Sequence, residues 1–229
     1  MKIIAILSEK GGAGKTMTTV TLATAAENHG LATVIFDLDP RANSAVWGDK
    51  RPNQIPQVVP AQAPRLAVLF AKAEEQGADL VIIDTAGNDL QTAEKVSSYA
   101  DLILIPCQPS PPDLSSIVPT VKVALTSGKL SFVLINRAPA VGNETDEARE
   151  AIEAAGVQVC PIVFYARKAF TSHFHEGLTA FDIEPRGKAA EEGRALFLWV
   201  AEQVGLITTK KDSMLTRKIV KHASKAEGD

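Results

Sequence analysis

Short apolar runs alternate with longer segments of helical spacing along the whole chain. The runs are rich in Ile, Val and Leu and show almost no polar alternation, which is typical of strands covered on both faces. They lie at residues 3–7, 33–36, 80–83, 102–105 and 131–135, with a weaker run at 157–163. The segments with helical spacing lie at 15–29, 66–76, 113–127, 145–155 and 187–204, and a glycine directly follows each of them.

Strands that alternate with helices predict βαβ units. We therefore expect an α/β fold with a doubly wound, mainly parallel sheet and helices on both faces. Ligands of such sheets bind at the carboxyl ends of the strands. The polar residues with candidate chemistry follow the predicted strands, so they are expected to meet at one edge of the sheet.

The first strand runs directly into a glycine-rich loop, residues 8–16 (SEKGGAGKT), and a helix follows at once. Glycines let backbone N–H groups converge on phosphate oxygens, and the N-terminus of the helix adds partial positive charge. Lys15 is then placed for the β- and γ-phosphates and the Thr16 hydroxyl for Mg²⁺. The alternative is an ordinary turn with two solvated lysines, which the strand–loop–helix order disfavours.

The loop departs from the general pattern G-x4-G-K-[ST], because Glu9 stands where the first glycine belongs. It matches the variant K-G-G-x-G-K-T instead, with Lys10 as an additional lysine. This variant resembles the phosphate loop of the ParA/MinD superfamily of P-loop NTPases. The resemblance implies ATP and Mg²⁺ as cofactors and a homodimer in which Lys10 reaches the partner's phosphates and stabilises transition-state charge. The implied nucleotide-binding residues are Gly11, Gly12, Ala13, Gly14, Lys15, Thr16 and Met17.

Met17 departs from the family pattern, which usually has a second Thr or Ser after the magnesium threonine. A side-chain hydroxyl near the α-phosphate is therefore missing, and a lower nucleotide affinity is expected.

Acidic residues follow the second and third predicted strands. Asp37 and Asp39 follow the run at 33–36, in a D-x-D-P stretch that resembles switch I of partition ATPases, where the second acid positions the attacking water. We expect Asp39 to be catalytic, whereas Asp37 is open to a structural role in capping the turn. Asp84 follows the run at 80–83 in a Walker B arrangement and is expected to hold Mg²⁺. Residues 85–87 would begin switch II.

Two further segments resemble the family. Residues 105–114 (IPCQPSPPDL) are similar to a segment near its dimer interface, although a plain proline-rich loop fits them nearly as well. Asn136 directly follows the run at 131–135, at the position where the family's asparagine reads the adenine edge; the alternative is a turn asparagine. The resemblance covers residues 1–205, which we expect to form the ATPase domain.

Charge and composition bear on the C-terminal tail, the cysteines and membrane association. The net charge is −3, but the basic excess is concentrated in residues 206–229, which we expect to form a basic tail, helical or partly disordered. The apolar face of that tail, around Leu215 and Ile219, is narrow for a lipid anchor. Cys107 and Cys160 stand alone and are expected to be buried free thiols of a cytoplasmic protein. No apolar stretch reaches the ~20 residues of a membrane helix.

Within the superfamily, the chain resembles the small partition ATPases, since the first strand begins at Lys2 and leaves no room for an N-terminal helix-turn-helix domain. The resemblance implies slow, partner-stimulated ATP hydrolysis, non-specific DNA binding, a centromere-binding adaptor and a nucleoid-associated location. Arg167, Lys168 and Arg186 are the expected DNA contacts. The alternatives are a MinD-like membrane-associated positioning ATPase and an accessory ATPase of DNA transfer.

Overall fold

The computed structural model describes residues 1–207, and the predicted tail lies almost entirely outside them. Eight strands form a sheet in the order β3-β2-β4-β1-β5-β6-β7, with β8 also paired to β6. Every pair is parallel. The strands are β1 (Lys2–Ile6), β2 (Thr33–Asp37), β3 (Gln57–Pro60), β4 (Leu80–Asp84), β5 (Leu102–Cys107), β6 (Leu130–Ala138), β7 (Gln158–Val159) and β8 (Phe164–Tyr165). The predicted doubly wound α/β fold is confirmed.

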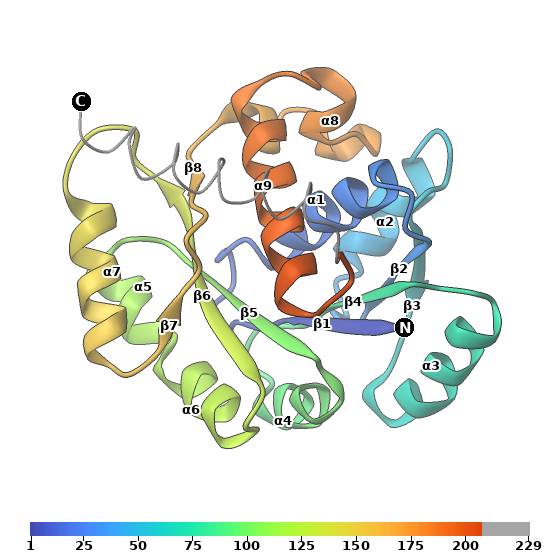
Figure 1. Cartoon of the computed structure of the whole chain (residues 1–229), viewed down its shortest axis with the longest axis horizontal. Helices are drawn as coiled ribbons and strands as arrows, with labels where there is room; N and C mark the ends of the chain where they lie inside the picture. Colours follow the sequence, from blue (N-terminus) through green and yellow to red (C-terminus); the bar gives the residue numbers. More distant parts are fainter. Residues whose placement is uncertain (208–229) are drawn as a thin grey trace.

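Helices cover both faces of this sheet (Figure 1). One face is covered by α1 (Lys15–Asn28), α2 (Asn43–Lys50), α8 (Ala180–Ile183) and α9 (Lys188–Gln203). The other is covered by α3 (Leu66–Glu75), α4 (Leu90–Tyr99), α5 (Pro111–Ser116), α6 (Val118–Thr126) and α7 (Glu144–Ala154). Within residues 1–207 there are also three single-turn 3₁₀ helices, η1 (Ala63–Arg65), η2 (Lys168–Phe170) and η3 (Phe174–Glu176).

The central strands β1, β4 and β5 are buried along most of their length, which explains their unbroken apolar sequences. Alternate residues of each strand enter opposite layers: Ile4 and Ile6 of β1 join the cluster under α1 and α9, whereas Ala5 joins the cluster under α4. Both layers therefore hold β1, and through it the loop that follows, in a fixed position.

Two predicted elements differ from the observed ones. The helix expected at 113–127 is two helices, because Pro119 cannot donate a backbone hydrogen bond and begins α6 in the first turn after Ile117. The weak strand at 157–163 is replaced by the two-residue strands β7 and β8. Both cysteines are buried free thiols, as expected. Among residues 1–207, no helix has the length and apolar character needed to cross a membrane.

Candidate nucleotide site

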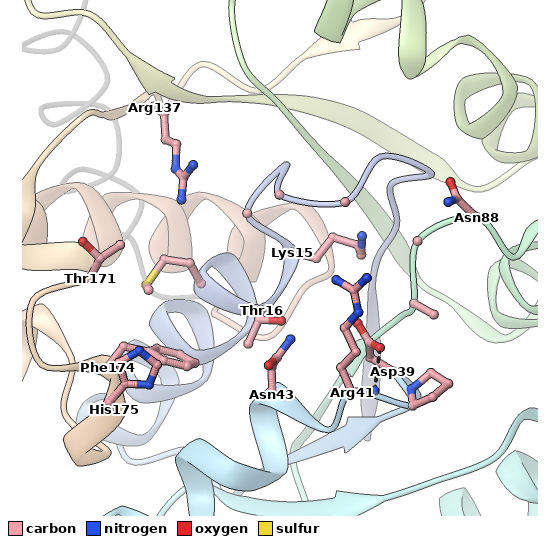
Figure 2. Close-up of a pocket in the computed structure, with 17 residues that line it drawn as sticks. Lys15, Thr16, Asp39, Arg41, Asn43, Asn88, Arg137, Thr171, Phe174 and His175 are labelled. Atoms are coloured by element: carbon pink, nitrogen blue, oxygen red, sulfur yellow. Dashed lines mark hydrogen bonds between the residues drawn. The ribbon is translucent and has the colours of Figure 1, made fainter.

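A cavity of about 530 Å³ lies at the carboxyl ends of β1, β2 and β4. Residues from the phosphate loop, the segment after β2 and the segment after β4 line one part of it, and Arg137 with η3 lines the rest (Figure 2). Lys15, Thr16 and Asp39 all lie in its wall. The residues predicted for phosphate, metal and water chemistry therefore meet at one edge of the sheet, as the strand order requires.

The phosphate loop has the backbone geometry of an anion cradle. Gly12 and Gly14 have φ values of 83° and 100°, in the left-handed region that glycine tolerates. A Cβ atom at Gly14 would lie 2.0 Å from Nδ2 of Asn136. No side chain caps the N-terminus of α1, so its first N–H groups remain available to an anion.

Lys15 is almost fully buried, and its ammonium donates to the carbonyl oxygens of Ser8, at 3.0 Å, and Lys10, at 3.3 Å. Burial lowers the pKa of Lys15; Asp84 and Asp39 act in the opposite direction, and the nearby Arg41 lowers the pKa further. A buried ammonium held only by carbonyl oxygens gains from a phosphate group in the adjoining cavity.

Asp84 is fully buried and lies at the centre of the expected metal site. Its Oδ2 accepts hydrogen bonds from Thr16 Oγ1 at 2.8 Å and from Ser44 Oγ at 2.7 Å, while Oδ1 has no partner among the described residues. Burial raises the pKa of Asp84 to about 7, against the effect of these two hydroxyls. An orphaned buried carboxylate oxygen beside two hydroxyls fits Mg²⁺, which Thr16 and Asp84 would hold directly or through water.

The two acids after β2 have different surroundings. Asp37 is buried, and its carboxylate accepts from the backbone N–H groups of Asp39, at 3.0 Å, and Ala45, at 2.9 Å. Asp37 therefore caps the turn after β2, which is the structural role that the sequence left open for it. Asp39 is partly exposed, lines the cavity and accepts from the N–H of Arg41 at 2.9 Å. Asp39 is thus the acid with access to a water molecule in the cavity.

The predicted switch II segment packs directly on the phosphate loop. The N–H of Asn88 donates to Glu9 O at 2.9 Å, and the Thr85 hydroxyl donates to Ile6 O at 2.8 Å. A Cβ at Gly87 would approach Glu9 O to 2.8 Å. A residue larger than glycine at position 87 would push the two loops apart.

Lys10 does not point into the cavity of its own chain. Its ammonium lies 2.7 Å from Oδ1 of Asp113, at the start of α5, and Ser110 also hydrogen-bonds this carboxylate. The proline-rich segment 105–114 therefore holds the additional lysine of the loop.

Both ends of the Asn136 side chain are hydrogen-bonded within the chain. Its amide donates to Ala13 O at 2.7 Å and its oxygen accepts from the N–H of Arg137 at 2.9 Å, so both ends contact backbone. Arg137, not Asn136, lines the cavity. Base recognition by Asn136 stays a prediction.

The three expected DNA contacts are not equivalent. Arg167 pairs with Glu192 at 2.5 Å and stacks over the ring of Tyr165. Lys168 and Arg186 are exposed, and neither has an ion-pair partner within residues 1–207. The basic residues of the tail lie outside the described part of the chain.

Several site residues were not anticipated from the sequence. Ser44 completes the surroundings of Asp84 from α2, and Arg41, Arg137, Phe174 and His175 line the cavity. The D-x-D-P stretch pointed to the segment that carries Arg41 and Ser44. No pattern pointed to Phe174 or His175, because they come from an irregular segment remote in sequence.

The fold and the site define a P-loop nucleotide-binding protein. The family model described as the CobQ/CobB/MinD/ParA nucleotide binding domain matches residues 4–178, and the chain belongs to this family. The predicted ParA/MinD membership is therefore confirmed. This is a family of ATPases that bind nucleotide with Mg²⁺, which agrees with the expected cofactors ATP and Mg²⁺.

Individual relatives differ in what their names describe. Maintenance of carboxysome distribution protein A of Gloeobacter kilaueensis is 31% identical over 206 residues, covering 89% of this chain and 94% of that protein. Protein virC1 of Rhizobium radiobacter is 26% identical over 190 residues, covering 78% of this chain and 82% of that protein. The septum site-determining protein MinD of Pyrococcus horikoshii, complexed with Mg-ADP, has the same fold, with a TM-score of 0.69, 19% identity and coverage of 90% and 98%.

Proposed function

We propose that this protein is a partition ATPase: it dimerises with ATP, binds DNA without sequence preference, and segregates plasmid or chromosome DNA with a centromere-binding adaptor. The observation that carries the proposal is the position of Lys10. Its ammonium lies outside its own phosphate site, on a partly exposed segment beside Asp113. A lysine placed there serves a partner's nucleotide better than its own.

The chemistry of hydrolysis falls to Lys15, Thr16 and Asp39, which line one cavity, and to Asp84, which is buried and hydrogen-bonded to Thr16. Lys15 binds the β- and γ-phosphates, Thr16 and Asp84 hold Mg²⁺, and Asp39 orients the attacking water. The bound Mg²⁺ supplies charge neutralisation on the phosphates. Hydrolysis is slow until a partner stimulates it, and the dimer then separates.

DNA binding falls to basic residues of the C-terminal third. Lys168 and Arg186 are exposed and carry no competing ion pair among the described residues, which favours salt-sensitive contact with phosphates. Arg167 must first leave Glu192, so it contributes less than the other two. A protein that holds bulk DNA in this way is cytoplasmic and nucleoid-associated.

One observation favours a second candidate. The similarity to a carboxysome distribution protein extends over 89% of this chain. The same ATP-driven dimer, bound to DNA, would then distribute a protein assembly instead of a DNA molecule. The two candidates share the ATP and DNA steps and differ in the adaptor.

The test is co-sedimentation of the protein with DNA and, separately, with anionic liposomes, under ATP, ADP and no nucleotide, at two salt concentrations. Retention on DNA that requires ATP and weakens with salt is the expected result. Retention on liposomes alone would reject DNA binding and favour a MinD-like membrane role. Lys168→Ala with Arg186→Ala should weaken DNA retention, whereas Lys72→Ala, on exposed α3, is the matched control.

A further inference from the structure

Arg41 lines the same cavity as the phosphate loop. It follows Asp39 and Pro40, and its N–H donates to Asp39 Oδ1 at 2.9 Å. Ala42, with a φ of 52°, then turns the chain into α2, where Ser44 bonds Asp84. Figure 2 shows the side chain of Arg41 extending toward Lys15, beside Asp39. Short connections thus tie Arg41 to the residues expected to hold water and Mg²⁺.

The guanidinium of Arg41 is not paired with any carboxylate of the described residues. It is exposed to the cavity, and within residues 1–207 it forms no ion pair. Arg41 and Lys15 line the same cavity, and Figure 2 shows the two side chains extending toward each other. Two cations that face one cavity repel each other, and an anion between them removes that cost.

The contrast with Arg51 shows what a structural arginine looks like in the same region. Arg51 is 5% exposed and bonds Gly177 O and the carboxylate of Asp182. Its buried guanidinium is thus matched by acceptors of its own chain. Arg41 has a charge of the same kind directed at an open cavity that accepts nucleotide, so its acceptor is expected to be the ligand.

We propose that Arg41 is a further catalytic residue, which binds the γ-phosphate in cis and stabilises the charge that develops on it during hydrolysis. This inference rests on the proposed ATPase function. The planar guanidinium donates two parallel hydrogen bonds to phosphate oxygens, which an ammonium cannot do. Lys10 of the second chain would supply a cation from the other side.

The reaction itself needs no further component. The water oxygen bonds to the γ-phosphorus, the bond from that phosphorus to the bridging oxygen of ADP breaks, and its electron pair leaves with ADP. The proton of the attacking water ends on the released phosphate or in solvent. Negative charge spreads over the γ-oxygens in the transition state, and Arg41 acts on that charge.

The experiment compares Arg41→Ala and Arg41→Lys with wild type in two assays. The first is ATP turnover; the second is affinity for ADP alone and for ADP with aluminium fluoride and Mg²⁺, which mimics the transition state. Arg41→Ala should lower turnover at least about 100-fold and weaken the aluminium fluoride complex by a similar factor, with affinity for ADP little changed. Arg41→Lys should recover only part of both losses.

Arg65→Ala is the matched control, since Arg65 is an exposed arginine of η1 outside the cavity. It should behave as wild type in both assays. Unchanged turnover in Arg41→Ala, or equal weakening of ADP and of the aluminium fluoride complex, would overturn the inference. A wild-type protein that hydrolyses no ATP would instead reject the proposed function, and the aluminium fluoride affinities would still decide the role of Arg41.

Discussion

The ammonium of Lys10 lies 2.7 Å from the carboxylate of Asp113 and is held there by a residue 103 positions away in the sequence. Burial alone would raise the pKa of Asp113, but the bonds from Lys10 and Ser110 outweigh it and hold that pKa below its ordinary value. The Asp113 carboxyl is therefore ionised at neutral pH. In the proposed cycle, Lys10 would have to leave Asp113 before it reaches a second chain, so we expect this contact to oppose dimerisation.

Asp113→Asn should strengthen the ATP-dependent dimer. Replacing the carboxylate by an amide weakens a charge-assisted bond at a partly exposed site, which corresponds to about 1 kcal/mol and a roughly fivefold lower dimer dissociation constant. Analytical ultracentrifugation in the presence of ATP measures this dissociation constant. The gain should vanish in the double variant with Lys10→Ala; a weaker dimer in Asp113→Asn alone would show that Asp113 supports the dimer instead.

Arg51 ties α2 to the segment that carries Phe174 and His175. It donates to Gly177 O at 3.0 Å and forms two hydrogen bonds with Asp182, at 3.0 and 3.2 Å. Arg51→Met should lower the free energy of unfolding by about 2–4 kcal/mol, because Gly177 O and Oδ1 of Asp182 lose the donor that Arg51 supplies, while Thr179 still donates to Oδ2 of Asp182. Denaturant unfolding measures the loss, and Arg65→Met should change stability by less than about 0.5 kcal/mol.

The same pair gives a pH dependence. Burial would raise the pKa of Asp182, but the bonds from Arg51 and Thr179 hold it below its usual value of 3.8. A depressed folded-state pKa contributes stability that is fully present well above pH 3.8 and is lost as the pH falls through the folded-state pKa. The difference in stability between wild type and Arg51→Met should therefore shrink in acid. A difference that stays constant from pH 7 to pH 3 would contradict this.

Asp84 is expected to destabilise the folded protein when no metal is bound and to be necessary for Mg²⁺ binding. Its folded-state pKa of about 7 lies above its usual value, so the ionised carboxylate destabilises the metal-free protein increasingly from pH 3.8 to 7. Asp84→Asn keeps an oxygen for Thr16 and Ser44. It should raise the Tm without Mg²⁺, more at pH 8 than at pH 5, and abolish the gain in nucleotide affinity that Mg²⁺ gives. Mg²⁺-dependent binding in this variant would remove Asp84 from the metal site.

Asn136 offers a choice between two roles that binding measurements separate. The structure places its amide on Ala13 O, beneath the phosphate loop. Asn136→Ala should therefore lower the affinities for ATP and for GTP by the same factor, since the phosphate loop loses a buried hydrogen bond. If Asn136 reads the adenine edge, as the sequence resemblance implies, the variant should lose affinity for ATP alone.

The buried centre of the fold was predictable, whereas its edges were not. β1, β4 and β5 are covered on both faces, so their sequences are continuous apolar runs that stand out. β3 is an edge strand with no buried residue, and α4 buries only Ala93, Val96 and Ser97. β3 has no alternating apolar pattern, and the buried residues of α4 lie at helical spacing but are few; neither element was predicted. α2 buries only Ser44 and Trp47 and was missed for the same reason.

The residues of the site also fall into those that the sequence predicted and those that it did not. Lys15 and Thr16 begin the helix after the loop that follows β1, Asp39 lies two residues after β2, and Asp84 ends β4, so local sequence pattern was enough to predict that they lie at the cavity or beside it. The contact of Lys10 with Asp113 and that of Asn136 with Ala13 join segments more than 100 residues apart. Such contacts depend on how β5 and β6 are ordered beside β1, which the alternation of strands and helices does not specify.

The proposed cycle depends above all on ATP joining two chains through Lys10. The most direct measurement is the molar mass of the protein by sedimentation equilibrium with Mg²⁺ and ATP, in the Asp39→Ala background that is expected to slow hydrolysis. We predict a dimer with ATP, a monomer with ADP, and a monomer with ATP when Lys10→Ala is added. A Lys10→Ala protein that dimerises with ATP as well as its parent would contradict this role of Lys10.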